Sequence, residues 1–242
     1  MKKLIIKYWY SILSHIVGSE NISEYRKSKR SKNLIRQAPY AISKGSSIAQ
    51  MHGTNIAMAF GTLLGAYREH GIIRHDYDMD ITMDYHFITA KLIQDFVHRG
   101  FKFIAAYQAS DNQDCHVALE YKGAKFDVYS YRVDDDKKTI TLFAPSPIDE
   151  NWNKSAQLGQ TLINRYTFPY QGFTEIDFLG CNVSIFKNAE QILKMLYGEN
   201  FMKPDKGYRV ESLVFDFKTI EPLEKCYAKI CDYDTFLKQR IL

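Results

Sequence analysis

Residues 76–83, in which acidic and apolar side chains alternate, constrain the fold of this chain more than any other segment. Acidic side chains alternate there with apolar or aromatic ones, in the order Asp76, Tyr77, Asp78, Met79, Asp80 and Ile81. A period of two is typical of a β-strand, whose neighbouring side chains point to opposite faces. The stretch therefore predicts a strand with one acidic face and one face packed on a core.

The acidic face predicts a bound cation. Three carboxylates on one side of a strand repel one another unless a positive charge lies between them. Divalent cations with oxygen ligands supply that charge. Magnesium is the usual choice where phosphates complete the coordination, and manganese is the alternative. A calcium loop would need a glycine after the third aspartate, but Ile81 stands there, so the stretch does not fit such a loop.

A phosphate-binding turn is predicted just before the acidic strand. Gly61 and Thr62 stand between a short apolar run, residues 55–60, and a helix-like segment, residues 63–70. We expect the run to be a buried strand, Thr62 to cap the helix and Gly71 to end it. A glycine at such a turn either lets backbone N–H groups approach a phosphate or serves close packing. The acidic strand that follows favours the phosphate.

A third carboxylate is expected from elsewhere, because a two-metal site needs another ligand. Asp127 lies in a predicted strand, residues 125–131, with apolar neighbours on both sides. Such an acid lies either in solvent at the end of a sheet or in a site, and the acidic strand favours the site. We expect Asp127 to bind metal and to act as base for an attacking hydroxyl. Lys125 shares its face, and we expect His116 to be structural or to support the ligands from behind them, not to be catalytic.

Further helices and strands give an α+β chain. Residues 86–99 predict a helix. Strands are expected at residues 101–107, 116–121 and 125–131, with a turn at residues 122–123.

The later segments are less regular. Residues 134–138 combine three aspartates with two lysines between strand-like runs, which predicts a solvated hairpin tip rather than a metal site. Residues 145–170 show little periodicity, so we expect an irregular loop or insertion there. The remaining predicted elements are a short strand at Val183, a helix over residues 189–197 ended by Gly198, and a helical tail over residues 221–242.

The first 37 residues differ from the rest. Residues 1–18 predict an amphipathic helix, whose polar residues interrupt any membrane span or signal peptide. This helix either packs on the core or lies in the interface of an anionic membrane. Residues 19–37 predict a linker with a basic cluster made of Arg26, Lys27, Lys29, Arg30 and Lys32. The expected division is therefore residues 1–37 and a main domain over residues 38–242.

Charge and cysteine content exclude several classes of protein. The net charge is +4, from 32 basic and 28 acidic residues, which is too small to indicate nucleic-acid binding by the whole chain. The four cysteines are scattered without a CxxC pair, which predicts reduced thiols rather than a zinc site or disulfides. We therefore expect a cytoplasmic protein, with a peripheral position at the inner face of the cell membrane as the alternative.

Two motifs resemble the LicD/fukutin family, which belongs to the nucleotidyltransferase-fold superfamily. The first comprises Gly61-Thr62-Leu63-Leu64-Gly65-Ala66, Arg68, Gly71 and His75 to Ile81. The second comprises Leu179-Gly180, Val183, Lys187 to Glu190, Leu193-Lys194, Tyr197-Gly198, Asn200 and Pro204. The resemblance implies a nucleotidyltransferase-like mixed sheet flanked by helices, with N-terminal and C-terminal helical additions.

The resemblance also implies an activity. Family members transfer a phospho-alcohol, such as phosphocholine, ribitol phosphate or glycerol phosphate, from a CDP-activated donor to a hydroxyl of a surface glycan or its lipid-linked precursor, and release CMP. Such glycans include lipopolysaccharide, capsule and teichoic acid. By the same resemblance, Asp78 and Asp80 would be paired metal ligands and Asp127 the third. Asp76 would support them, either behind the ligands or on a second ion.

Four other residues are expected to contact the phosphates of the donor. The resemblance assigns Gly61 and Thr62 to the donor phosphates. Arg68, on the predicted helix, either clamps a phosphate or pairs with an acid on the surface. Arg74 stands where the family commonly has proline, and it adds a cation beside the acidic strand that could contact a phosphate.

Two other functions stay open. The same fold could move a nucleoside monophosphate from a nucleoside triphosphate to a small acceptor, or it could be a non-catalytic binding module. The intact acidic strand argues against the binding module, because a module without chemistry has no need of clustered carboxylates.

Overall fold

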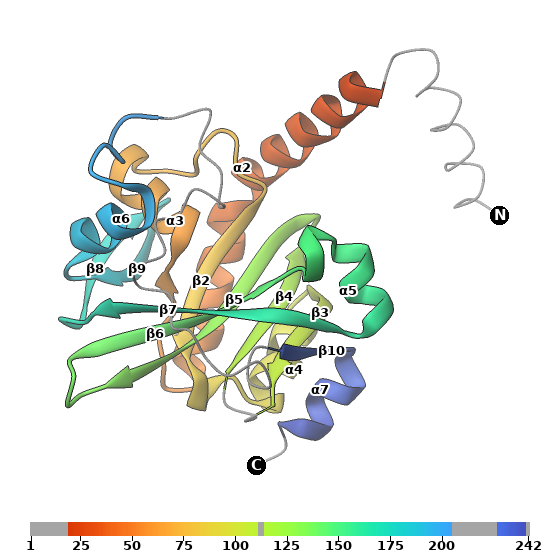
Figure 1. The fold of residues 1–242 in the computed structure, drawn as a ribbon. Helices are drawn as coiled ribbons and strands as arrows, with labels where there is room; N and C mark the ends of the chain where they lie inside the picture. The colour runs from red at the N-terminus through yellow and green to blue at the C-terminus, as the bar shows by residue number, and fades with distance from the viewer. Residues whose placement is uncertain (1–18, 111–113, 205–226, 241–242) are drawn as a thin grey trace.

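The computed structural model describes residues 19–110, 114–204 and 227–240, which form a large mixed sheet with helices packed around it (Figure 1). This architecture confirms the predicted α+β class. The N-terminal helix expected over residues 1–18 lies outside the described residues, and so does the first part of the expected C-terminal helix, up to residue 226.

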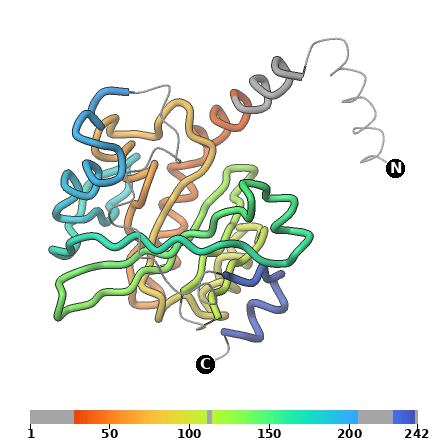
Figure 2. Tube along the Cα trace, in the orientation of Figure 1, coloured from red at the N-terminus to blue at the C-terminus, as the bar shows by residue number. Residues whose placement is uncertain are grey.

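Among the described residues, strands follow one another without a helix between them over residues 101–146 and again over residues 160–186, and helices separate these two runs from the remaining strands (Figure 2). The helices and helical turns are α2 (Ser19–Met51), α3 (Phe60–Leu64), the π-helical turn η1 (Gly65–Glu69), η2 (Tyr85–Phe87), α4 (Ala90–His98), η3 (Ile148–Glu150), α5 (Trp152–Leu158), α6 (Ala189–Tyr197) and α7 (Tyr233–Gln239). The strands are β1 (Ala57–Met58), β2 (Asp78–Asp84), β3 (Phe101–Ala109), β4 (Cys115–Tyr121), β5 (Ala124–Asp134), β6 (Thr139–Ser146), β7 (Gln160–Pro169), β8 (Phe173–Phe178), β9 (Cys181–Phe186) and β10 (Tyr227–Cys231).

Part of the sheet closes on itself. The strand order is β4-β3-β10-β7-β6-β5-β2-β1-β9-β8, and β4 also pairs with β5. Within the described residues, β4, β3, β10, β7, β6 and β5 therefore form a closed ring of antiparallel pairs. The parallel pair β2–β5 joins this ring to the open wing of β2, β1, β9 and β8. Figure 1 shows β6 and β7 running across the front of the molecule.

The long helix α2 covers the apolar face of β2 and β5. A Cβ added at Gly45 of α2 would lie 2.7 Å from the ring of Phe126 on β5, so glycine permits a close approach of helix and strand. The acidic side chains of both strands consequently point away from α2. The fully buried residues of α2 recur at helical spacing, and they are Leu34, Ala38, Ala41, Ile42, Ile48 and Ala49.

Residues 19–37, expected to be a basic linker, are helical. α2 runs without a break from residue 19 past residue 37, so the division expected there falls inside a continuous helix. From Ser31 onward one face of the helix packs on the body of the protein, and the Ser31 hydroxyl donates to the backbone carbonyl of Arg74. Among residues 28–37, whose burial is described, only Ser31 and Leu34 are buried before Ala38, and the charged exposed side chains around them hide this spacing in the sequence.

The prediction of an irregular segment over residues 145–170 is wrong. This segment contains α5 and the whole of β7, which pairs with β6 on one side and β10 on the other. Two inward positions of β7 are polar, Thr161 and Arg165, and they interrupt the apolar alternation that marks a strand. Arg165 is accommodated because its Nε donates to the buried Asp114 carboxylate at 2.8 Å.

The tail is also only partly helical. Tyr227–Cys231, expected to be helix, is the strand β10 between β3 and β7, whereas α7 agrees with the prediction. A five-residue strand carries too short a pattern to identify from sequence. The features that agree with the sequence include the acidic strand β2, strands β3 to β5 and β9, helices α4 and α6, and the turns at residues 122–123 and 134–138.

Candidate active site

Strands β2 and β5 run parallel and place three carboxylates together. Their register sets Asp80 opposite Asp127, and Asp78 opposite Lys125. One oxygen from each of Asp78, Asp80 and Asp127 lies within 4.8 Å of the others. The intervening side chains of both strands pack in the core. The structure thus brings together three of the predicted ligands from two strands that are distant in sequence.

Two hydrogen bonds hold Asp80 in place. Its backbone N–H donates to the Thr62 hydroxyl at 2.8 Å, and the Tyr129 hydroxyl donates to Asp80 Oδ1 at 3.2 Å. The other oxygen, Oδ2, lies toward Gly61, where an added Cβ would be 3.4 Å away. Asp80 is only 9% exposed, so its carboxylate is fixed from both sides.

Asp127 lies between a lysine and a histidine. Lys125 Nζ donates to Asp127 Oδ2 at 3.4 Å and lies 3.5 Å from Asp78 Oδ2. His116 Nε2 is 3.2 Å from Asp127 Oδ1, but the two atoms are not aligned for a hydrogen bond. Within the described part of the chain, Oδ1 is buried without a hydrogen-bond partner, which is rare for a carboxylate oxygen. A basic side chain therefore lies beside each of the two oxygens of Asp127, His116 at Oδ1 and Lys125 at Oδ2.

The carboxylates oppose one another electrostatically. Burial, and then the charge of Asp127, raises the pKa of Asp78. Burial and the charges of the other three aspartates raise the pKa of Asp80 well above its usual value. Burial also acts to raise the pKa of Asp127, but His116 and Lys125 together bring it below its usual value. A divalent cation would relieve this repulsion, and three hard oxygen ligands fit magnesium or manganese.

Asp76 lies just before β2 and outside the group of three. Its carboxylate packs against Gly61, where an added Cβ would be 3.1 Å from Asp76 Oδ2. Burial, followed by the charge of Asp78, raises the pKa of Asp76 to about 7, and Arg68 partly offsets this rise. The predicted ladder of three aspartates is therefore a pair on β2 completed by Asp127, with Asp76 beside them.

Gly61 and Thr62 lie in the first turn of α3, next to the aspartates. The helix begins earlier than expected, with Ala59 as its N-cap and no side-chain cap, so the prediction that Thr62 caps the helix is wrong. Thr62 instead accepts the backbone N–H of Asp80. A Cβ at Gly61 would lie 3.1 Å from Asp76 Oδ2 and 3.4 Å from Asp80 Oδ2, so glycine leaves room for both carboxylates beside the helix.

Helix α3 continues into the π-helical turn η1, where a second glycine is required. A Cβ added at Gly65 would lie 2.5 Å from the carbonyl oxygen of Gly71, so Gly65 serves close packing. The left-handed residue that ends the turn is His70, with φ of 51°, rather than Gly71. Single π-turns inside helices often occur at functional sites.

Arg68 connects the two sequence motifs. Its Nη1 donates to the backbone carbonyl of Phe201 at 2.8 Å, and its Nε donates to Glu69 at 2.9 Å. Its charge also offsets part of the rise in the pKa of Asp76. The guanidinium therefore influences the site without joining the group of three carboxylates. Arg74 is exposed in the loop before β2, near Asp76 in sequence.

Aromatic rings stack beside the carboxylates, a feature that the motifs do not reveal. The imidazole of His116 lies between Tyr107 and Tyr129, with ring centroids 5.2 Å and 4.4 Å away and planes inclined by 10° in both pairs. Tyr129 follows Asp127 by two residues on the same strand, and this spacing is the signal in the sequence that points to it. His116, expected to be structural, is buried against Asp127.

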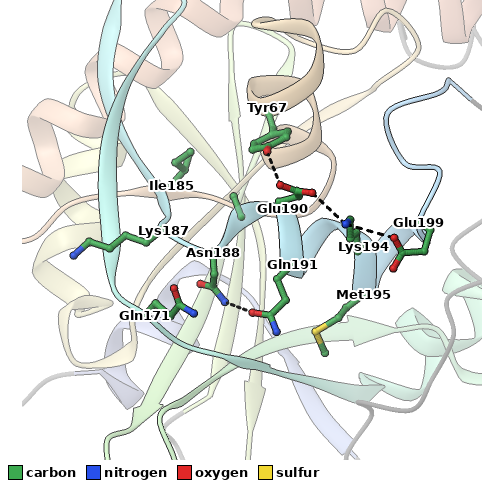
Figure 3. Close-up of a pocket in the computed structure, with 11 residues that line it drawn as sticks. Tyr67, Gln171, Ile185, Lys187, Asn188, Glu190, Gln191, Lys194, Met195 and Glu199 are labelled. Atoms are coloured by element: carbon green, nitrogen blue, oxygen red, sulfur yellow. Dashed lines mark hydrogen bonds and ion pairs between the residues drawn. The ribbon is translucent and has the colours of Figure 1, made fainter.

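A hollow of about 690 Å³ lies beside η1 and α6 (Figure 3). The Tyr67 hydroxyl donates to Glu190 at 3.5 Å, and Lys194 pairs with both Glu190 and Glu199. Lys187 also lines the hollow, which thus carries residues of the second sequence motif. The three grouped carboxylates do not line it, so the hollow is separate from the candidate metal site.

A family model described as LicD/FKTN/FKRP, nucleotidyltransferase domain, matches residues 53–188. The chain belongs to this family. The matched range contains β1 to β9 and all four aspartates of the site, whereas α6 follows it. Membership supports a transferase activity of the phosphotransferase kind, in the modification of glycans. No curated protein matches the chain.

No helix among the described residues combines the length and the apolar content needed to cross a bilayer.

Proposed function

We propose that this chain transfers a phospho-alcohol from a CDP-activated donor to a hydroxyl of a glycan or lipid-linked glycan. The acceptor oxygen bonds to the β-phosphorus of the donor, the bond from that phosphorus to the bridging oxygen breaks, and CMP leaves with that oxygen. The acceptor proton passes to a carboxylate. The observation that carries the proposal is the convergence of Asp78, Asp80 and Asp127 in a chain of this family.

The carboxylates would hold a divalent cation, magnesium or manganese. Such a cation neutralises part of the charge on a diphosphate when it is bound. Asp78 and Asp80 present oxygens from β2, and Asp127 presents one from β5. Lys125, within 3.5 Å of both strands' carboxylates, balances one negative charge of the group.

The donor would enter on the side of α3. Gly61 brings helix backbone next to Asp76 and Asp80, so phosphates between the helix and the cation would meet N–H groups of the first turn. Arg68 adds positive charge on this side, and exposed Arg74 could add more. Asp127 lies on the far side of Asp80, where an ionised carboxylate could accept the proton of the acceptor hydroxyl.

Donor identity can be tested directly on the purified chain. We expect one of CDP-choline, CDP-ribitol, CDP-glycerol and CDP-ethanolamine to raise the melting temperature in the presence of magnesium, because a ligand stabilises the state it binds. The same donor should release CMP when an acceptor glycan is added. EDTA is the control for metal. If a folded, metal-binding chain neither gains stability nor releases CMP with any donor, the proposal fails.

Nucleotidyl transfer is the second candidate, favoured by the nucleotidyltransferase domain that the family model describes. In that reaction a nucleoside triphosphate would lose pyrophosphate as its α-phosphorus bonds to the acceptor. Incubation with each triphosphate and a pyrophosphate assay would separate the two reactions. A chain that binds metal and releases neither CMP nor pyrophosphate would instead be a binding module.

We also propose that the basic start of α2 brings the chain to an anionic membrane surface. Lys29, Arg30 and Lys32 are exposed on this helix, and lysine and arginine near an anionic surface each contribute about 1 kcal/mol of attraction. Changing the three to glutamine should reduce binding to phosphatidylserine vesicles in a flotation assay. A control variant changes three exposed lysines elsewhere, Lys91, Lys102 and Lys122. Equal binding by both variants would contradict the proposal.

A further inference from the structure

A continuous row of rings crosses the acidic face of the sheet. Tyr129 on β5, His116 on β4 and Tyr107 on β3 stack in succession, and Trp152 of α5 meets Tyr107 edge to face at 5.9 Å. The row starts at Asp80, which accepts the Tyr129 hydroxyl, and passes Asp127, which lies 3.2 Å from His116. It therefore leads from the carboxylates outward across three neighbouring strands.

The outer end of the row is open to solvent. The side chain of Trp152 is 48% exposed, although it is the largest apolar ring of the row, and Tyr107 is only half-buried. The charge of Asp127, after burial, raises the pKa of Tyr107, so its hydroxyl lies within electrostatic reach of the site. An exposed indole at the end of this row presents apolar area that a ligand could cover.

The order of strands assigns this end of the row to one substrate. Gly61 and α3 follow β1, on one side of β2, whereas His116 and Tyr107 lie on β4 and β3, beyond β5. Donor phosphates next to Gly61 would therefore leave Trp152 on the opposite side of the carboxylates. Asp127, the carboxylate on that side, lies 3.2 Å from the imidazole of His116, the middle ring of the row.

We propose that Trp152 and Tyr107 form a stacking wall for a sugar ring of the acceptor glycan. This inference rests on the proposed transfer to a glycan hydroxyl. A sugar ring has an apolar C–H face that packs on an aromatic ring, while its hydroxyls stay hydrated or reach the reacting phosphorus. The wall would position the acceptor, and Asp127 would receive its proton.

Binding can be measured without any transfer reaction. The chain has two tryptophans, Trp9 and Trp152, so Trp9→Phe leaves Trp152 as the single indole. We expect its fluorescence to change on titration with methyl glycosides of glucose, galactose, N-acetylglucosamine and N-acetylgalactosamine, and to stay constant with CMP. A response to CMP alone would place the nucleotide base on the wall and overturn the inference. The absence of a response to every glycoside would overturn it too.

The KM values for the acceptor and the donor provide a second, independent test of the stacking wall. Trp152→Ala should raise the KM for the acceptor glycan about tenfold or more, by the size of aromatic stacking contributions, and leave the KM for the donor unchanged. Trp152→Phe should restore most of the acceptor affinity. Tyr40→Ala removes an exposed ring from α2 and is the matched control. An equal rise in both KM values for Trp152→Ala, with the melting temperature unchanged, would contradict an acceptor wall.

The two experiments separate this inference from the proposed function. A fluorescence response to glycosides in a chain that releases no CMP from any donor would retain the wall and reject the transfer reaction. CMP release by a chain whose Trp152 variants keep the wild-type acceptor KM would retain the reaction and reject the wall.

Discussion

Asp80 and Asp127 lie opposite each other on parallel strands, and each depends on a different neighbour. Asp80 accepts the hydroxyl of Tyr129, and Asp127 is flanked by Lys125 and His116. The protein thus surrounds one carboxylate with a neutral donor and the other with basic groups. This asymmetry suits a site in which one carboxylate chiefly holds a cation and the other also meets the acceptor.

Asparagine at position 80 should separate metal binding from folding. Asp80→Asn keeps the size of the side chain but removes one negative ligand, so we expect magnesium no longer to raise the melting temperature. Activity should fall at least about 100-fold, since metal stabilisation of a transition state contributes several kcal/mol. In EDTA the variant should be no less stable than the wild type, because a repulsion is removed.

The matched control for this variant is Asp84→Asn, which changes an aspartate of the same strand outside the group of three. Full stabilisation of Asp80→Asn by magnesium would show that Asp80 is not a ligand.

Asp76 should make the stability of the metal-free protein depend on pH. Folding raises its pKa from 3.8 to about 7, so the folded state holds this proton over a range in which the unfolded state has lost it. The stabilising contribution is complete below about pH 4 and is lost as the pH rises toward 7. In Asp76→Asn the free energy of unfolding should fall less over this pH range, and the difference from the wild type should be at most about 4 kcal/mol. Urea unfolding in EDTA across this range measures it, and parallel curves for both proteins would refute the expectation.

At the scale of elements, the α3–η1 segment decides how close the helix comes to the acidic strand. Its two glycines act differently: Gly61 faces carboxylates, and Gly65 faces the backbone carbonyl of Gly71. The sequence predicted the helix, but not the groups that Gly61 and Gly65 contact. Contacts between segments on either side of a loop leave no periodic pattern in the sequence. Thr62 shows the same limit, since its partner Asp80 lies on another element.

Alanine at position 65 should disrupt this segment. The added Cβ would be 2.5 Å from a backbone oxygen, which cannot move as freely as a side chain, so we expect a loss of about 1–3 kcal/mol. Gly71→Ala is the matched control in the same turn, because its Cβ would meet the Glu69 carbonyl oxygen at an ordinary 3.8 Å. Chemical denaturation of both variants tests the contrast, and equal losses would contradict it.

At the scale of the whole molecule, the closed ring explains which parts the sequence could predict. Strands β3, β4 and β5 pair with neighbours in the chain and have a visible pattern. By contrast β7 pairs partly with β10, which comes after residue 226, and it buries Arg165 against Asp114 on the other side of the ring. A buried arginine looks like a surface residue in a sequence until its distant partner is known.

Asp114 should be important for the stability of the ring. Its carboxylate accepts from Arg165 of β7 and Arg132 of β5, both at 2.8 Å, and it is 2% exposed. Asp114→Asn removes the negative charge from this buried group, so we expect a loss of about 3–5 kcal/mol. Asp134→Asn, at the exposed hairpin tip, is the control and should change stability little. Equal melting temperatures for the two variants would refute this role.

Closure of the ring by β10 has a consequence for synthesis. The other five strands of the ring lie between residues 101 and 169, and β10 ends at Cys231. On the ribosome, β3 and β7 therefore emerge well before the strand that joins them, with their facing edges unpaired. Unpaired edges bind other chains. A nascent chain stalled before residue 227 would already hold every aspartate of the site, and yet we expect it to need a chaperone until the final strand arrives.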